Sequence, residues 1–237
     1  ECRDGRLRIE LSNPMMGSES HTRGNQMALA NIRERLMLFF DSPNPAPNPR
    51  RVRIFAAEKG VALPSQTVSL IAREHKAPEF VALNPRGQTP ALQLDDGTVI
   101  SESVAICRYL EGLHPTPPLF GTGAKEGALV EMWSRRVEMI LMPAVGAVWV
   151  HTHDFTRHLP GRNAEWGEAN RPRIADAMRF FDASLSGRAF LAGDSFTIAD
   201  ILLLTTVDFA AFIGEAMPAD CAQLARWHAA VSARPSA

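Results

Sequence analysis

The sequence has few cysteines, and their spacing argues against several kinds of cysteine-based site. Cys2, Cys107 and Cys221 are the three cysteines, and they are far apart with no C-x-x-C pair and no histidine at metal-ligand spacing. A disulfide framework, a zinc site and a dithiol redox pair all need closer or paired cysteines. We therefore expect no metal ion and no disulfide-based fold.

Long apolar runs and an excess of one charge are also missing. No run reaches the roughly 20 residues that span a bilayer, and no stretch joins a basic start to an apolar core as a signal peptide does. The chain has 25 basic and 26 acidic residues, a net charge of -1. Such a balance indicates no surface for nucleic acid or for anionic membranes. We expect a cytoplasmic protein that acts on small molecules.

The composition allows two domains. The 237 residues are 46% hydrophobic and 22% charged, which is ordinary for a globular protein. Residues 1–36 lack sustained periodicity, and we interpret them as a leader or extension outside the fold, although Ile32 to Leu36 could form a helical turn. Residues 115–124 contain three prolines and two glycines. Neither a helix nor a strand passes through such a stretch, so we predict a linker between a domain over 37–114 and one over 125–237.

Strand and helix signals alternate in the first domain. A short apolar strand, Met37 to Phe40, precedes a proline-rich loop, and a helix is predicted from about Arg50 to Lys59 with Gly60 after its end. Alternation of apolar and polar residues over 65–71 predicts a second strand.

The second half of this domain reads as a short helix, a hairpin and a longer helix. The helix covers residues 79–83, and the hairpin strands 91–94 and 98–100 meet across an Asp-Gly turn. Ser101 is expected to cap the last helix, whose apolar residues recur at helical spacing. The predicted order is βαβαββα.

Residues 125–237 have helical patterns throughout. One apolar stripe runs from Trp133 to Val148 and includes Ile140, and Pro143 is expected to kink its helix. A second stripe runs from Ile174 to Leu185.

A helix start is predicted at Thr197, where the side chains of Thr197 and Asp200 can each accept a hydrogen bond from the other residue's backbone N–H. The final helix is predicted from Cys221 to Ala233. These patterns indicate an all-α bundle.

The strongest local motif is Asn84-Pro85-Arg86-Gly87-Gln88-Thr89-Pro90-Ala91-Leu92. Pro90 directly precedes a predicted strand although it has no N–H to donate. An ordinary trans proline that opens a strand is one interpretation. A cis proline, as in thioredoxin-like folds, is the other, and it would turn the backbone groups of Thr89 outward to pair with an extended peptide.

Glu102 and Ser103 form a second motif, 12 residues after Pro90. They offer a carboxylate, a hydroxyl and free backbone N–H groups at a helix start, where the helix dipole favours an anion. Alone, they could simply begin a helix.

Together the two motifs resemble the glutathione-binding half of cytosolic glutathione transferases. His75-Lys76-x-Pro-Glu-Phe is similar to a stretch of the phi class. The resemblance extends from about Met37 to the C-terminus. It implies a thioredoxin-like α/β domain followed by an all-α bundle, a homodimer, and glutathione as cosubstrate beside a small apolar electrophile.

The family pattern assigns contacts to glutathione residue by residue. Thr89, before Pro90, would pair through its backbone with the cysteinyl part, and Glu102 and Ser103 would hold the γ-glutamyl amine and carboxylate. His75, Lys76 and Gln88 would face the glycyl end, unless His75 and Lys76 are only solvated surface residues.

The residue that activates the thiol is less well defined. A tyrosine-type enzyme is excluded, because Tyr109, the one tyrosine, lies in a later helix. The beta-class cysteine is also missing, since Ala46 occupies its place. Ser42 resembles the serine of the serine-type classes, while Asn48 matches the nu-class pattern Pro-Asn-x-x-x-[Ile/Val]. We favour Asn48, with Ser42 second, and both could instead be turn residues.

Three further functions are compatible with this resemblance. A glutathione-dependent disulfide reductase or peroxidase comes first, since Asn48 is nu-like. A zeta-class isomerase is disfavoured because its Ser-Ser-Cys-Ser loop is absent, and a non-catalytic binding protein would not need the intact motifs.

Other residues are less informative. Cys107 is expected to be a buried thiol, and His151 and His153 to be surface residues. Met139, Met142, Trp149 and Phe155 could line the cosubstrate pocket or form core.

Overall fold

The computed structural model describes residues 2–3, 6–7, 37–43 and 45–237. The predicted leader falls mostly on residues outside this set. Its described parts, Cys2–Arg3 (β1) and Arg6–Leu7 (β2), pair as a two-stranded antiparallel sheet.

The first domain is built on a four-stranded mixed sheet. Its strands are β3 (Leu38–Asp41), β4 (Ser65–Thr67), β5 (Ala91–Gln93) and β6 (Val99–Ser101). The spatial order is β4-β3-β5-β6, with β3 and β4 parallel and the other pairs antiparallel. A parallel pair needs a crossover, and helix α2 (Pro47–Glu58) supplies it.

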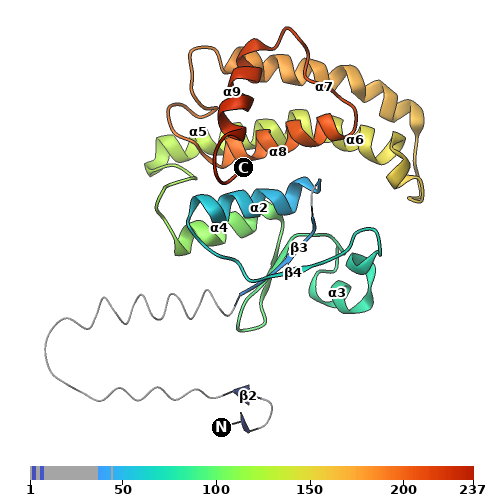
Figure 1. Cartoon of the computed structure of the whole chain (residues 1–237), viewed down its shortest axis with the longest axis vertical. Coiled ribbons are helices and arrows are strands. Elements are labelled where there is room, and N and C mark those ends of the chain that lie inside the picture. The colour runs from blue at the N-terminus through green and yellow to red at the C-terminus, as the bar shows by residue number, and fades with distance from the viewer. Residues whose placement is uncertain (1, 4–5, 8–36, 44) are drawn as a thin grey trace, which may run out of the picture.

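Two helices lie between this sheet and the second domain. Helix α2 and helix α4 (Ser103–Leu113) pack together there, whereas η1 (Glu74–Lys76) and α3 (Pro78–Leu83) lie away from the helical layer (Figure 1). The predicted order βαβαββα is confirmed, with η1 as an additional short element.

The second domain is a bundle of helices. Its elements are α5 (Gly123–Arg136), η2 (Val137–Leu141), α6 (Met142–Thr152), η3 (Asp154–Thr156), α7 (Ala164–Ser184), α8 (Ile198–Phe212) and α9 (Ala222–Ser232). Among the described residues, no helix has both the length and the apolar character needed to cross a bilayer.

Helix α8 is the central element of the bundle. Its residues 201–204 are apolar and fully buried, as expected for a helix that is hydrophobic on all sides. The predicted capping box is present, since Thr197 and Asp200 bond reciprocally at the start of α8. Asp200 also accepts hydrogen bonds from the N–H of Leu191 and the indole of Trp227. This carboxylate therefore ties three segments together.

The junction between α5 and α6 contains an element that was not predicted. Before Pro143, where a kink was predicted, the chain forms a π-helix over Val137–Leu141. Pro143 has no N–H, and the wider turn before it accommodates this loss. Ile140, predicted to point inward, is 42% exposed, because the extra residue of a π-turn displaces the apolar stripe.

Three predicted boundaries in the first domain were wrong. The strand predicted over 65–71 covers only Ser65–Thr67, because the chain turns toward η1 after Val68. Helix α2 begins at Pro47 rather than Arg50, and Pro47 loses no intrahelical bond at this first position. Ser101 ends β6 and does not cap the next helix, since Glu102 occupies the capping position of α4.

Candidate functional site

The loop before β5 leaves a free stretch of backbone at the end of an inner strand of the sheet. The Thr89–Pro90 peptide bond is cis, as expected. Within the described residues, neither the N–H nor the C=O of Thr89 makes a hydrogen bond. An extended peptide can pair with such groups.

The preceding turn is held by short polar contacts. The amide of Asn84 donates to the carbonyl of Gln88 at 2.7 Å, and Lys76 Nζ donates to the carbonyl of Gly87, also at 2.7 Å. Gly87 has φ +55°, and a Cβ there would lie 2.7 Å from the carbonyl oxygen of His75. Glycine is therefore required where this turn meets η1.

The start of α4 carries two of the predicted binding residues. Glu102 has φ 68° and ψ 119°, a strained conformation that costs about 1–3 kcal/mol for a residue other than glycine. Ser103 is 7% exposed, and its hydroxyl has no partner within the described part of the chain. A buried hydroxyl that makes no internal bond is available to a ligand.

The predicted binding residues of η1, of the turn before β5 and of the start of α4 lie next to one another. Lys76 Nζ donates to the carbonyl of Arg86 at 3.3 Å. Arg86 connects them, since its Nε is 3.1 Å from Gln88 Oε1 and 3.5 Å from Glu102 Oε1. Burial lowers the pKa of His75, and the positive charges of Lys76 and Arg73 lower it further. Arg86 was not singled out from the sequence, although it lies inside the motif.

The two candidate catalytic residues differ in whether their side chains have a hydrogen-bond donor left for a ligand. Ser42 follows β3, is 0% exposed and donates its hydroxyl proton to the carbonyl of Val68 at 2.9 Å. Its oxygen lies 2.8 Å from Thr89 Oγ1, and because the Ser42 proton is already used, Thr89 must be the donor in this contact. No proton of Ser42 is left for a thiolate.

Asn48 is half-buried in the first turn of α2, and its amide oxygen accepts a 2.6 Å hydrogen bond from Arg51 Nη1. Its Nδ2 group has no partner among the described residues.

Prolines restrict the backbone donors at this helix start. The N–H groups of the N-cap residue and of the first three helical residues have no intrahelical acceptor. In α2 the N-cap residue is Ala46, whose N–H donates to the carbonyl of Pro43 at 3.4 Å. In α2 the first and third positions are Pro47 and Pro49, which leaves only the N–H of Asn48.

Aromatic rings gather at the C-terminal ends of α6 and α8. The ring of Trp149 lies 5.5 Å from Phe155 and 5.2 Å from Phe209. His153, expected at the surface, is partly buried with its ring 4.5 Å from Trp149. Met142 is at the start of α6 and contacts Arg51, whereas Met139 is largely exposed.

Cys107 does not belong to the site. It is fully buried, as predicted, and burial raises the pKa of its thiol. Within the described residues, no group of three His, Cys, Asp or Glu side chains could hold a metal ion.

Known proteins match both halves of the chain. Residues 46–113 match the family model of the glutathione S-transferase N-terminal domain, and residues 137–235 match that of the C-terminal domain. Glutathione S-transferase 2 of Saccharomyces cerevisiae is 38% identical over 84% of this chain and 87% of its own length. The chain belongs to the glutathione S-transferase family.

Solved structures of this family show the same fold. A glutathione S-transferase domain-containing protein of Marinobacter aquaeolei superposes with a TM-score of 0.78 at 37% identity, covering 84% of this chain and 98% of that protein. Gtt2 of Saccharomyces cerevisiae also gives 0.78, at 36% identity, covering 84% and 97%. The chain is thus a glutathione S-transferase, with a thioredoxin-like N-terminal domain and a helical C-terminal domain, and glutathione is the substrate that its family implies.

Proposed function

We propose that this glutathione S-transferase binds glutathione as an extended strand beside Thr89. The free N–H and C=O of Thr89 support this role, because a peptide in that position pairs with both. The unpartnered hydroxyl of Ser103 and the helix start behind it receive the γ-glutamyl carboxylate, while Glu102 receives the amine. His75, Lys76 and Gln88 lie toward the glycyl end.

Asn48 is proposed to activate the thiol. A free thiol has a pKa of about 8.5, and a hydrogen bond to the charged sulfur together with a helix N-terminus lowers it. The free Nδ2 group and backbone N–H of Asn48 can supply both contacts. The thiolate then attacks an electrophilic carbon, a C–S bond forms, and the leaving group departs with the bonding electrons.

The second substrate in this proposal is a small apolar electrophile. The rings of Trp149, Phe155 and Phe209 support an apolar site at the ends of α6 and α8. These ends are near the start of α2, since Arg50 pairs with Asp208, the neighbour of Phe209.

Glutathione-dependent disulfide reduction or peroxidase activity is the second candidate. The free Nδ2 group of Asn48, together with a Ser42 hydroxyl whose proton is already used, favours it because the pattern is nu-like. In this reaction the thiolate attacks one sulfur of a disulfide and the other sulfur leaves as a thiolate.

Domain limits and assembly complete the proposal. We place the linker at 115–124 between domains over 37–114 and 125–237, with 1–36 as an extension. We further propose a metal-free, cytoplasmic homodimer that binds neither nucleic acid nor membrane. Exposed apolar residues on α5, η2 and α7 support a homodimer, namely Leu129, Met139, Ile140 and Phe180.

One panel of assays tests the function. Purified protein is given glutathione with chlorodinitrobenzene, an organic peroxide or hydroxyethyl disulfide, and glutathione affinity is measured by calorimetry. Faster turnover of chlorodinitrobenzene supports transferase activity, and faster turnover of hydroxyethyl disulfide supports the reductase. Absence of glutathione binding would contradict both.

A further inference from the structure

Arg51 is buried where the two domains meet, and all its hydrogen-bond partners are neutral. It is 2% exposed, on the face of α2 that packs against α8. Nε donates to Thr205 Oγ1 at 3.0 Å, Nη2 donates to Thr206 Oγ1 at 3.2 Å and to Met142 Sδ at 3.2 Å, and Nη1 donates to Asn48 Oδ1 at 2.6 Å. The shortest of these bonds joins Arg51 to the proposed catalytic residue.

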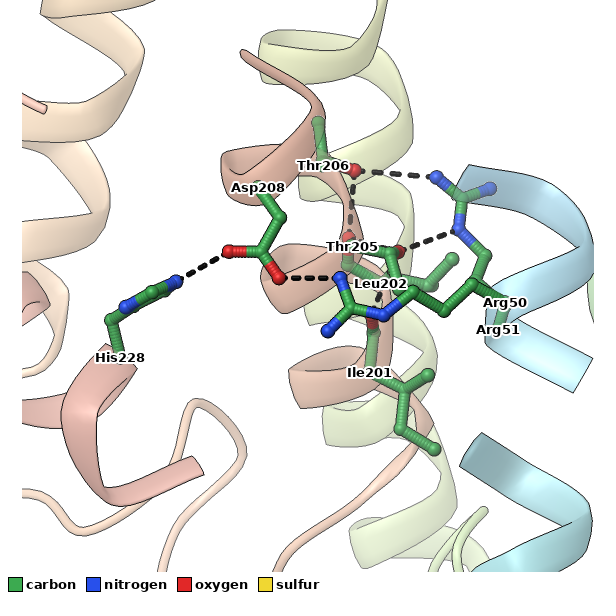
Figure 2. A network of polar contacts seen from close by, with 8 residues as sticks. All are labelled: Arg50, Arg51, Ile201, Leu202, Thr205, Thr206, Asp208 and His228. Carbon is green, nitrogen blue, oxygen red and sulfur yellow. Dashed lines mark hydrogen bonds and ion pairs between the residues drawn. The ribbon is translucent and has the colours of Figure 1, made fainter. Parts of the chain in front are cut away.

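The threonine partners are oriented by their own helix. Thr205 donates its hydroxyl proton to the carbonyl of Ile201 at 2.9 Å, and Thr206 donates to the carbonyl of Leu202 at 2.7 Å (Figure 2). Both hydroxyl oxygens are therefore left with lone pairs for the guanidinium. Helix α8 thus holds Arg51 in one position.

The neighbouring arginine provides a contrast. Arg50 pairs with the carboxylate of Asp208, which also accepts from His228 at 2.6 Å (Figure 2). Arg51 has no carboxylate within hydrogen-bonding distance among the described residues. A buried cation without a hydrogen-bonded anion is costly, and perturbed buried charges of this kind cluster at functional sites.

Among the described residues no ionisable group hydrogen-bonds to Arg51, although the Glu138 carboxylate attracts it from a distance. Burial lowers the pKa of Arg51 to about 10, against the attraction of Glu138 and Cys107. Glu138, on η2, is paired with Arg135 at 2.6 Å. Cys107, on α4, is a buried thiol whose pKa is raised. Arg51 therefore stays positively charged at neutral pH.

The chemistry of arginine fixes the orientation of Asn48. A guanidinium only donates hydrogen bonds, so the amide atom that meets Nη1 must be the oxygen. The amide nitrogen then points away from Arg51. We propose that Arg51 is a positioning residue of the transferase, which presents the Asn48 Nδ2 donor to the glutathione sulfur and places a buried positive charge behind it. This inference rests on the proposed role of Asn48.

A double-mutant cycle tests the proposal through the ionisation of bound glutathione. The pKa of the bound thiol is read from the ultraviolet absorbance of the thiolate in wild type, Arg51→Met, Asn48→Ala and the double variant. Arg51→Met is expected to raise this pKa by about one unit, and the double variant is expected to raise it by less than the sum of the two single variants. An unchanged pKa in Arg51→Met, or additive shifts in the double variant, would overturn the proposal.

Arg50→Met is the matched control. It removes an arginine from the same helix and the same domain contact, but within the described residues this arginine pairs with Asp208 and makes no hydrogen bond to Asn48. It should leave the pKa of the bound thiol unchanged. Affinity for S-methylglutathione, which has no thiol to ionise, should change less than twofold in Arg51→Met. An equal thiol shift in both arginine variants would mean that Arg51 acts only through the domain contact, which would overturn the proposal.

A second variant covers the case in which Arg51→Met does not fold. Asn48→Asp keeps an oxygen toward Arg51 and supplies the missing anion, so the melting temperature should rise. The same change replaces the Nδ2 donor with a negative charge, so the bound thiol should ionise at higher pH than in Asn48→Ala. No gain in melting temperature would overturn the contact with Arg51, and this readout holds even if wild type fails to bind glutathione.

Discussion

Glu58 at the end of α2 forms a bidentate ion pair with Arg234 of the C-terminal segment. Nε and Nη2 of Arg234 donate to the two oxygens of Glu58 at 2.8 and 2.6 Å. Each domain contributes one partner, so this pair fastens the sheet-bearing domain to the helical one.

Replacing Arg234 with alanine should destabilise the protein by about 1–2 kcal/mol, the usual range for a partly exposed bond to a charged group. Burial raises the pKa of Glu58, but hydrogen bonds from Arg234 and Ser236 outweigh it and lower the pKa overall. A lowered folded pKa gives stability that is present above the unfolded value of about 4.5 and is lost as the pH falls further. Urea unfolding of wild type and Arg234→Ala should therefore converge at low pH. A constant difference down to the lowest pH would contradict this role.

Asp200 should be among the most sensitive positions for stability. Its carboxylate accepts from the N–H groups of Leu191 and Thr197 and from the indole of Trp227. Asp200→Ala leaves these buried donors without an acceptor, at a cost of about 3 kcal/mol or more. Thermal unfolding beside the exposed control Asp176→Ala would measure the difference.

Asp200 also predicts a pH dependence of the opposite sign to that of Glu58. Burial raises its pKa from 3.8 to about 6, against the lowering effect of its hydrogen bonds. Between these values the folded state binds more protons than the unfolded state, so this residue makes stability fall as the pH rises. The fall should be absent in Asp200→Asn, and an identical pH slope in both proteins would argue against it.

Ser103→Ala should weaken glutathione binding without unfolding the protein. The hydroxyl makes no bond within the described chain, so its loss costs the fold little. Loss of one hydrogen bond to a charged carboxylate lowers affinity by about 10-fold or more. Calorimetry would test this against Ser184→Ala, since the Ser184 hydroxyl donates to the carbonyl of Phe180 in its own helix. Equal affinities in the two variants would remove Ser103 from the site.

Asn48→Ala and Ser42→Ala should have separable effects. Asn48→Ala is expected to raise the pKa of bound glutathione with little loss of stability. Ser42→Ala leaves the buried carbonyl of Val68 without its donor, so it should cost about 1 kcal/mol or more in stability and leave the thiol pKa in place. Spectroscopic titration and melting curves would measure both effects, and the reverse ranking of thiol shifts would transfer the role to Ser42.

Periodicity and turn chemistry predicted the order of elements in both domains. The Asp-Gly hairpin, the capping box at Thr197 and Gly60 after α2 depend on neighbouring residues only, and each was correct. Ser101 was assigned to a helix cap because serine favours that position, but pairing with Ala91 across the sheet holds it in β6. Local propensity could not reveal this contact.

The choice between Ser42 and Asn48 could not be made from sequence alone. The difference depends on where the hydroxyl proton of Ser42 goes, and its partners Val68 and Thr89 lie 26 and 47 residues away. Arg51 was missed for the same reason, since its partners on α8 are 154 and 155 residues distant. One feature of the sequence could have indicated its burial. Arg51 lies four residues before Phe55, which places it on the buried side of α2.

Because of the π-helix at Val137–Leu141, the positions of the side chains near Asn48 depend on the number of residues in this turn. One added residue in a helix rotates everything after it by about 100° and moves it by about 1.5 Å. Met142 follows this segment directly and touches the guanidinium that holds Asn48. Removing a single residue from this turn would therefore swing the sulfur of Met142 away from Arg51, and the aromatic rings farther along α6 would turn with it.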